Sequence, residues 1–397
     1  MTTEREKLLR DPNLHVIFGI TLVAVMGVAV LAPAFPKIVN ELGISTRQVG
    51  LLITVFTLPG VFLTPVLGVL ADRLGRKRIL VPALLLFGLA GGMCTFVRHF
   101  HLLLLLRFFQ GVGAASLGSL NVTIIGDLYE GRLRARALGY NASVLSLGTA
   151  SYPAVGGGLA MLGWYYPFAL SFLAIPLGLF VLYRLNNPEP KSEEVLLAYM
   201  RSAWRSVRHI RVAGLFAAGL ITFIILYGSY LTFFPLLLGH SFGAPPYLIG
   251  LIMSSMSLTT ALTASQAGRL ARGFKKRSLL QISFSLYTLS LLIIPQVQAL
   301  WLFLLPAVLF GAAQGINIPA VQTMLTEQAP AKYRAAFMSL YGLILRLGQT
   351  CGPLIMGGAF HFWQMKGAFY AGAGFALAAI LIMSLTIKEL PNPLDAN

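Results

Sequence analysis

The chain has 397 residues, of which 57% are apolar and 11% are charged, and its net charge is +17 at pH 7. Water-soluble domains carry about 25% charged residues, so this composition excludes an ordinary soluble protein. The positive charge does not indicate a nucleic-acid surface, because the basic residues form no stripe interleaved with aromatic side chains.

Apolar runs that could cross a bilayer, which takes about 20 residues each, follow one another along the whole chain. Hydrocarbon offers no partner for free backbone groups, so each run is predicted to be a helix of an all-α membrane protein. We predict twelve transmembrane spans: 14–36, 47–71, 79–97, 101–125, 136–161, 166–185, 212–238, 246–271, 278–297, 300–325, 334–360 and 367–387.

The longest polar stretch divides these spans into two groups of six. The predicted organisation is a tail (1–13), a six-helix bundle (14–185), a linker (186–211), a second six-helix bundle (212–387) and a final tail (388–397). Apolar and arginine residues alternate at helical spacing over 195–208. This amphipathic segment is predicted either to lie along the inner leaflet or to form a solvated linker helix.

The basic residues are distributed unequally between the two sides. Loops and tails on one side carry 24 of the 30 Lys and Arg residues, and the opposite loops carry only Lys37, Arg47, Arg98 and Lys366. By the positive-inside rule, both termini are predicted to be cytoplasmic, in a multi-pass protein of a bacterial inner membrane. The first apolar run has no cleavage-site pattern, so we expect no removable signal peptide.

The chain repeats itself at an offset of 200 residues. The segment Gly68–Arg78 has a counterpart in Gly268–Arg277, and further matches pair Gly50 with Gly250, Gly111 with Gly311, Gly148 with Gly348 and Pro153 with Pro353. A repeat that covers both groups of spans predicts two equivalent halves that move against each other.

The loop at 68–78 carries a specific motif. Gly68 and Gly75 allow close helix approach and a tight turn, and a carboxylate such as Asp72 at a membrane edge needs a cation or a helix N-terminus. The spacing G-x-L-A-D-R-x-G-R-K-x-x-L resembles the signature loop of the major facilitator superfamily. That resemblance implies two pseudo-symmetric six-helix bundles that work by alternating access.

Two further segments are similar to motifs of that family. Arg107–Ala115 resembles its fourth-helix segment R-x-x-q-G-x-g-a-a. Gly148–Gly157, with Pro153, resembles the fifth-helix motif G-x-x-x-G-P-x-x-G-G of drug:proton antiporters, although Tyr152 replaces one glycine; Gly348, Gly352 and Pro353 form a related run. The alternative interpretation of both runs is close helix packing with a proline kink.

The resemblance also implies a conformational latch on the cytoplasmic side. In the family, the loop aspartate caps or pairs with the eleventh helix, and the second loop arginine bonds an acid of the fourth helix. The corresponding residues here are Gly68, Asp72, Arg73, Gly75, Arg76 and Asp127. The alternative is that these basic residues only obey the positive-inside rule.

None of the 13 acidic residues lies near the middle of a predicted span, whereas Arg107 and Arg346 do lie within spans. A buried arginine is costly, so each either faces the central pathway or has a structural role, Arg107 as a brace and Arg346 as the partner of Asp72. In the family, helices one, four, seven and ten line the cavity. The predicted pathway residues are therefore Arg107, Gln110, Gln314, Asn317 and Arg346, with interhelical hydrogen bonding as the alternative.

These features predict a secondary transporter that exports a small amphipathic or lipophilic compound, coupled to protons. The alternatives are an exporter or exchanger of an anionic or sugar-like solute, and a lipid or lysolipid flippase. An enzyme is not expected, because no nucleophile, base and metal constellation is evident. The predicted partners are the small-molecule substrate, protons and membrane lipids, for a monomer with no metal, cofactor or nucleic acid.

Overall fold

The computed structural model describes residues 8–187, 210–328 and 334–387, and the regular elements in these ranges are helices. The predicted amphipathic segment at 195–208 lies outside the described residues. Ten helices in the described ranges are long and apolar enough to span a membrane. One of them, within α18, is interrupted at Trp363 and Gln364, and α8 is a long but more polar helix. The twelve predicted spans therefore all fall on helical segments.

Within residues 8–187, the first half contains these α-helices: α2 (Pro12–Ala29), α3 (Phe35–Leu42), α4 (Thr46–Val49), α5 (Leu51–Leu74), α6 (Arg76–Met93), α7 (Phe100–Leu128), α8 (Gly131–Leu162), α9 (Tyr166–Ala169) and α10 (Ala174–Arg184). The second half contains α12 (Ile210–Ile224), α13 (Phe234–Phe242), α14 (Pro246–Ser265), α15 (Ala267–Gly273), α16 (Lys276–Ile293), α17 (Leu304–Gln328) and α18 (Arg334–Thr386). Between α12 and α13, the segment η4 (Ile225–Phe233) is a π-helix.

Local geometry follows the 200-residue repeat. Gly43 ends α3 with φ of 62°, and Gly243 ends α13 with φ of 61°, a left-handed conformation that glycine adopts without strain. Gly75, with φ of 104°, makes the tight turn between α5 and α6. Each half thus ends its first span in the same way.

Each half is also held together by the same backbone approach. A Cβ added to Gly111 of α7 would lie 2.1 Å from the carbonyl oxygen of Phe56 on α5. A Cβ added to Gly311 of α17 would lie 2.3 Å from the carbonyl oxygen of Met256 on α14. Only glycine allows these helices to pack so closely, which is a recurrent device where helices associate in lipid.

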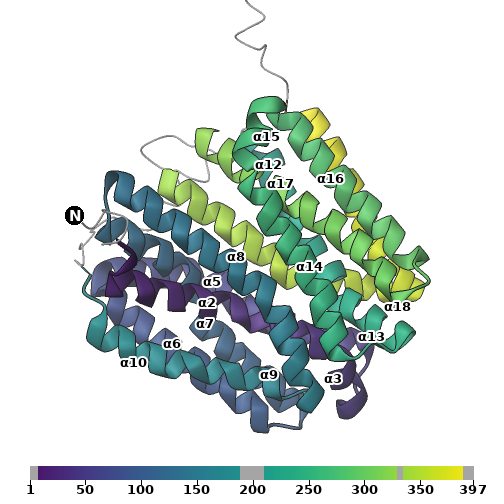
Figure 1. Ribbon diagram of the computed structural model, residues 1–397, viewed down its shortest axis with the longest axis horizontal. Helices are drawn as coiled ribbons and strands as arrows, with labels where there is room; N and C mark the ends of the chain where they lie inside the picture. Colours follow the sequence, from purple (N-terminus) through teal and green to yellow (C-terminus); the bar gives the residue numbers. More distant parts are fainter. Residues whose placement is uncertain (1–7, 188–209, 329–333, 388–397) are drawn as a thin grey trace, which may run out of the picture.

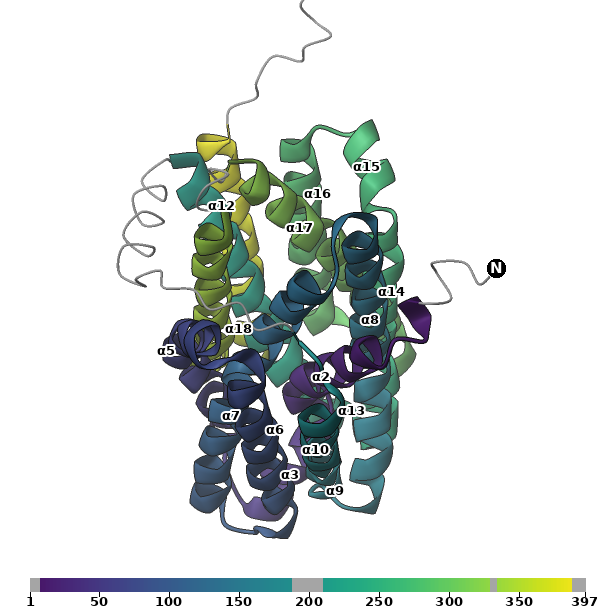
Figure 2. The same cartoon turned by 90° about the vertical axis from the view of Figure 1, so that its left-hand side faces the viewer.

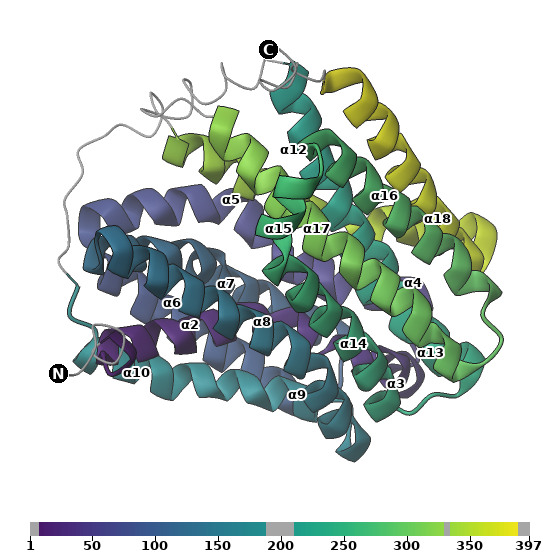
Figure 3. The ribbon, with the colours of Figure 1, turned by 45° about the horizontal axis from the view of Figure 1, so that its top comes forward.

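The two halves meet mainly along two helix pairs, α8 with α14 and α5 with α18, and α3 also contacts α13. The purple-to-teal first half and the green-to-yellow second half can be followed in Figures 1 and 3, where α8 and α14 lie side by side. We call the end of the molecule at Arg76 and Lys276 the basic side, and the end at Gly43 and Gly243 the far side. Figure 2 shows the two halves from a second direction.

Candidate functional site

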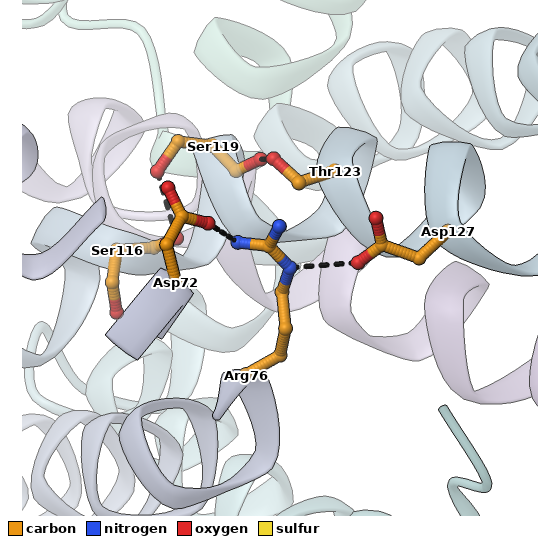
Figure 4. A network of polar contacts seen from close by, with 6 residues as sticks. All are labelled: Asp72, Arg76, Ser116, Ser119, Thr123 and Asp127. Carbon is orange, nitrogen blue, oxygen red and sulfur yellow. Dashed lines mark hydrogen bonds and ion pairs between the residues drawn. The ribbon is translucent and has the colours of Figure 1, made fainter. Parts of the chain in front are cut away.

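A charged cluster closes the basic side of the first half. The Arg76 side chain is buried and lies between two carboxylates, as Figure 4 shows. Its Nε donates to Asp127 Oδ2 at 2.7 Å, and one of its terminal nitrogens pairs with Asp72, four residues earlier across the Gly75 turn. At the equivalent positions of the second half, Lys276 Nζ lies 2.5 Å from Glu327 Oε2, on a more exposed surface. Each half therefore carries an ion pair that ties two neighbouring spans together.

The structure places the predicted latch residues within one half. Asp72, Gly75, Arg76 and Asp127 come together at the ends of α5, α6 and α7, whereas Arg73 is exposed. The predicted contact of Asp72 with the eleventh helix is not among the contacts of the described residues, and the side chains of 334–336 lie outside them. Gly68 has open space around it in this conformation.

The first glycine–proline run lies on the seam between the halves. A Cβ on Gly250 of α14 would lie 2.2 Å from the carbonyl oxygen of Pro153 on α8. A Cβ on Gly157 would lie 2.3 Å from the carbonyl oxygen of Pro246, and the Ala154 backbone N–H donates to Ser254 Oγ at 3.2 Å. Gly148, by contrast, packs against α2 of its own half.

The second glycine–proline run, with Gly348, Gly352 and Pro353, makes contacts both within its own half and with the opposite half. Gly348 and Gly352 pack within the second half, where added Cβ atoms would lie 2.7 Å from Leu220 O and 2.8 Å from Ile224 O. Pro353 reaches across to α5, 3.2 Å from the position of a Cβ on Gly50. Gly50 with Pro353 and Gly250 with Pro153 are the same contact at the 200-residue offset, so the seam itself obeys the repeat.

Arg107 and Gln110 lie inside the first bundle, with exposures of 1% each. Arg107 donates from Nε to the Leu52 carbonyl at 3.1 Å and from a terminal nitrogen to Gln110 Oε1 at 2.7 Å, and its guanidinium lies 4.1 Å from the centre of the Phe56 ring. Gln110 in turn donates to Ser171 at 3.0 Å. In this conformation these contacts match the bracing alternative rather than an open pathway.

Asn317 has a similar place in the second bundle. It is buried, accepts a hydrogen bond from Thr222 and donates one to Ser283, both at 3.0 Å. Gln314, one turn earlier on α17, is only partly buried, but its Oε1 atom is enclosed and has no hydrogen-bond partner in the described part of the chain.

Arg346 is placed differently, because it lies between the halves. A Cβ added to Gly60 on α5 would lie 3.3 Å from Arg346 Cδ and Nε, so the guanidinium rests against the backbone of the opposite half. Tyr227 of the π-helix η4 is a near neighbour of Arg346. The alternative partner, Asp72, is excluded in this conformation: it lies twelve residues from Gly60 along α5, about 18 Å away, and binds Arg76.

Three threonines that the sequence analysis did not single out join the halves beside Arg346. The Thr54 hydroxyl donates to the Thr350 carbonyl at 3.1 Å, and the hydroxyl oxygens of Thr57 and Thr350 lie 2.9 Å apart. Threonines within a membrane helix usually bond to their own helix backbone, so composition alone gave no signal for this role. The repeat marks only the neighbourhood of these threonines, because the nearby Gly50 has its counterpart in Gly250.

Burial along the seam helices shows which side is closed. On α14 the buried residues are Pro246, Ile249, Gly250, Ile252, Met253 and Met256, so none lies in the last nine residues of the helix, towards the basic side. On α5, residues 62–70 are all partly or fully exposed, although most residues from 52 to 61 are buried. Gly139 on α8 and Gly342 on α18 likewise have open space where a Cβ would be. The halves are therefore in contact on the far side and apart on the basic side.

The comparisons with known proteins agree with this architecture. The sequence model of the Major Facilitator Superfamily matches residues 17–240 and 221–397. The chain belongs to the Major Facilitator Superfamily. It is 26% identical over 384 residues to Multidrug resistance protein 1 of Bacillus subtilis (strain 168), covering 94% of this chain and 96% of the relative.

Other relatives give the same result. The chain is 24% identical to the class H tetracycline resistance protein of Pasteurella multocida, with 95% of each chain covered. Its fold matches the crystal structure of the nucleoside transporter NupG with a TM-score of 0.77 at 13% identity, covering 95% of this chain and 99% of the other. The transporter is thus a multi-pass membrane protein of this superfamily.

Proposed function

We propose that the protein exports small amphipathic compounds across the bacterial inner membrane by alternating access, with both termini in the cytoplasm. The observation that carries this proposal is the one-sided seam: α8–α14 and α5–α18 touch on the far side and separate on the basic side. With the basic side in the cytoplasm, as the positive-inside rule requires, this conformation is open inward. The drug-resistance relatives support export as the direction.

The pathway in this proposal runs between the halves and has its floor at Arg346, Thr57 and Thr350. Arg107, Gln110 and Asn317 act as internal struts of their bundles in this state. The latch residues would close the basic side in the opposite state. Proton coupling has no mid-span carboxylate to carry it, since all 13 acidic residues lie outside the span centres. The proposal is therefore restricted to substrate movement.

The test is to lock the seam. In a background without the native cysteines, the double variant Thr57→Cys/Thr350→Cys places thiols across the seam, where the hydroxyl oxygens are 2.9 Å apart. Purified protein in vesicles is assayed with labelled tetracycline, norfloxacin and a naphthalenesulfonate, with and without a pH gradient. We expect oxidation to reduce transport at least about tenfold and reduction to restore it, while each single-cysteine variant is unaffected. Alternating access is refuted if the oxidised double variant transports normally, and export of amphipathic compounds is refuted if none of the three crosses faster than in empty vesicles.

A further inference from the structure

We propose that the central site selects organic anions, with Arg346 as the residue that binds their anionic group. This inference rests on the proposed transport pathway and names the class of substrate it takes. Among the residues that the structure describes, none forms a hydrogen bond or an ion pair with the Arg346 guanidinium. A cation at this depth is costly without a counter-charge.

The surroundings of Arg346 leave room for a ligand. The side chain is only partly buried, although it lies twelve residues past the start of α18. The missing side chain of Gly60 lets the guanidinium lie along the backbone of α5. One turn further inward, Gly342 has no atom within 4 Å of where a Cβ would stand. Arg346 is thus reached from the open basic side.

The far side of Arg346, by contrast, is sealed. Thr350 lies one turn outward and contacts Thr54 and Thr57 of the opposite half. Pro353 follows, packed against Gly50. A ligand entering from the basic side therefore stops at the guanidinium, at the boundary between the closed and open parts of the seam.

The second nearby polar group is Tyr227, half-buried on η4. Its phenol can donate a hydrogen bond to an anion, and its ring stacks with Phe223 at a centroid distance of 5.9 Å. A guanidinium, a phenol and an aromatic surface suit an amphiphile with an anionic head and an apolar body. A cationic compound would instead meet an uncompensated positive charge.

Binding to the purified full-length protein tests this separately from transport. Matched triplets of aromatic acid, amide and amine, based on benzene, naphthalene and anthracene rings, are titrated while thermal unfolding is followed. We expect at least one acid to bind about tenfold more tightly than its amide and the amines to bind most weakly, because one charge-assisted contact separates the members of a triplet. The acid preference should vanish in Arg346→Gln, persist in part in Arg346→Lys and be unchanged in Lys366→Gln, an exposed lysine beyond the interruption of α18.

Two results would overturn the proposal: no acid binds better than its amide, or the preference survives in Arg346→Gln. A second arm adds lysophosphatidylglycerol to ask whether a lipid phosphate competes for the same site. Competition assigns a lipid as the anion, and its absence assigns a soluble carboxylate. Acid-selective binding without vesicle transport would leave the site intact and refute the exporter function instead.

Discussion

Substituting Gly157 with alanine should tilt the protein away from the conformation described here. The new Cβ would lie 2.3 Å from the Pro246 carbonyl oxygen, whereas ordinary contact begins near 3.4 Å, so α8 and α14 must separate by about 1 Å at the seam. Overpacking of this kind costs about 1–3 kcal/mol. The clash is absent when the halves separate on the far side. The population of the conformation that is open on the far side should therefore rise about 5- to 150-fold. Gly158→Ala is the matched control, because its Cβ meets nothing within 4 Å.

The population shift can be measured as a distance between the halves on the far side. Nitroxide labels on Glu41→Cys and His240→Cys report it, since both positions are exposed and lie at the ends of the contacting helices α3 and α13. Both native cysteines are replaced by serine in every variant. Pulsed electron–electron double resonance should then show a population with a longer distance between the two labels in Gly157→Ala but not in Gly158→Ala. An unchanged distance distribution in Gly157→Ala, or the same change in Gly158→Ala, would refute the assignment of this seam as a gate.

Three further predictions concern stability. Arg76→Gln leaves two carboxylates without their buried cation and should lower the free energy of unfolding by about 2–4 kcal/mol. Lys276→Gln removes one partner of a half-exposed ion pair and should lower the free energy of unfolding by less than about 1 kcal/mol. Equal losses of stability in thermal unfolding of the two variants would contradict this difference. Gly111→Ala, with its Cβ 2.1 Å from a backbone oxygen, should lower the melting temperature strongly, and Gly118→Ala, in open space, should not. Burial raises the pKa of the Tyr129 phenol, helped by its hydrogen bond to a carboxylate. The protonated phenol contributes its full stabilisation below its ordinary pKa of 10, and this stabilisation declines as the pH rises above 10. The Tyr129→Phe variant should therefore be less stable than the unmodified protein at neutral pH, and it should lose less stability than the unmodified protein above pH 10.

The sequence was sufficient to predict the architecture because the lengths of the apolar runs and the 200-residue offset can both be read directly from the order of residues. The offset also holds in the contacts of the structure, since Gly50 and Gly250 each meet a proline of the opposite half. Gly43 and Gly243 obey the same offset, and each takes the left-handed conformation at the end of a helix.

The site was less predictable because a helical position does not say which neighbour a side chain faces. Arg107 and Arg346 look alike in sequence, each a lone arginine in an apolar run. Arg107 points into its own bundle and finds carbonyl, amide and aromatic partners, whereas Arg346 meets the opposite half across Gly60. The difference depends on helix rotation, which tertiary packing sets. The π-helix η4 was also missed, because the sequence of Ile225–Phe233 carries no marker for an added residue per turn.

Between α8 and α14, the closed seam brings backbone against backbone at two glycines. At Gly157 and Gly250 a hydrogen atom, not a side chain, faces the carbonyl of the opposite helix. Such a surface has few rotamers to freeze when it shuts and few to release when it parts. At these two glycines the halves can therefore separate and rejoin without rearranging a side chain, whereas the threonine contacts between α5 and α18 must be broken and remade. The rate of switching should depend on those few polar contacts and on the movement of whole helices through lipid.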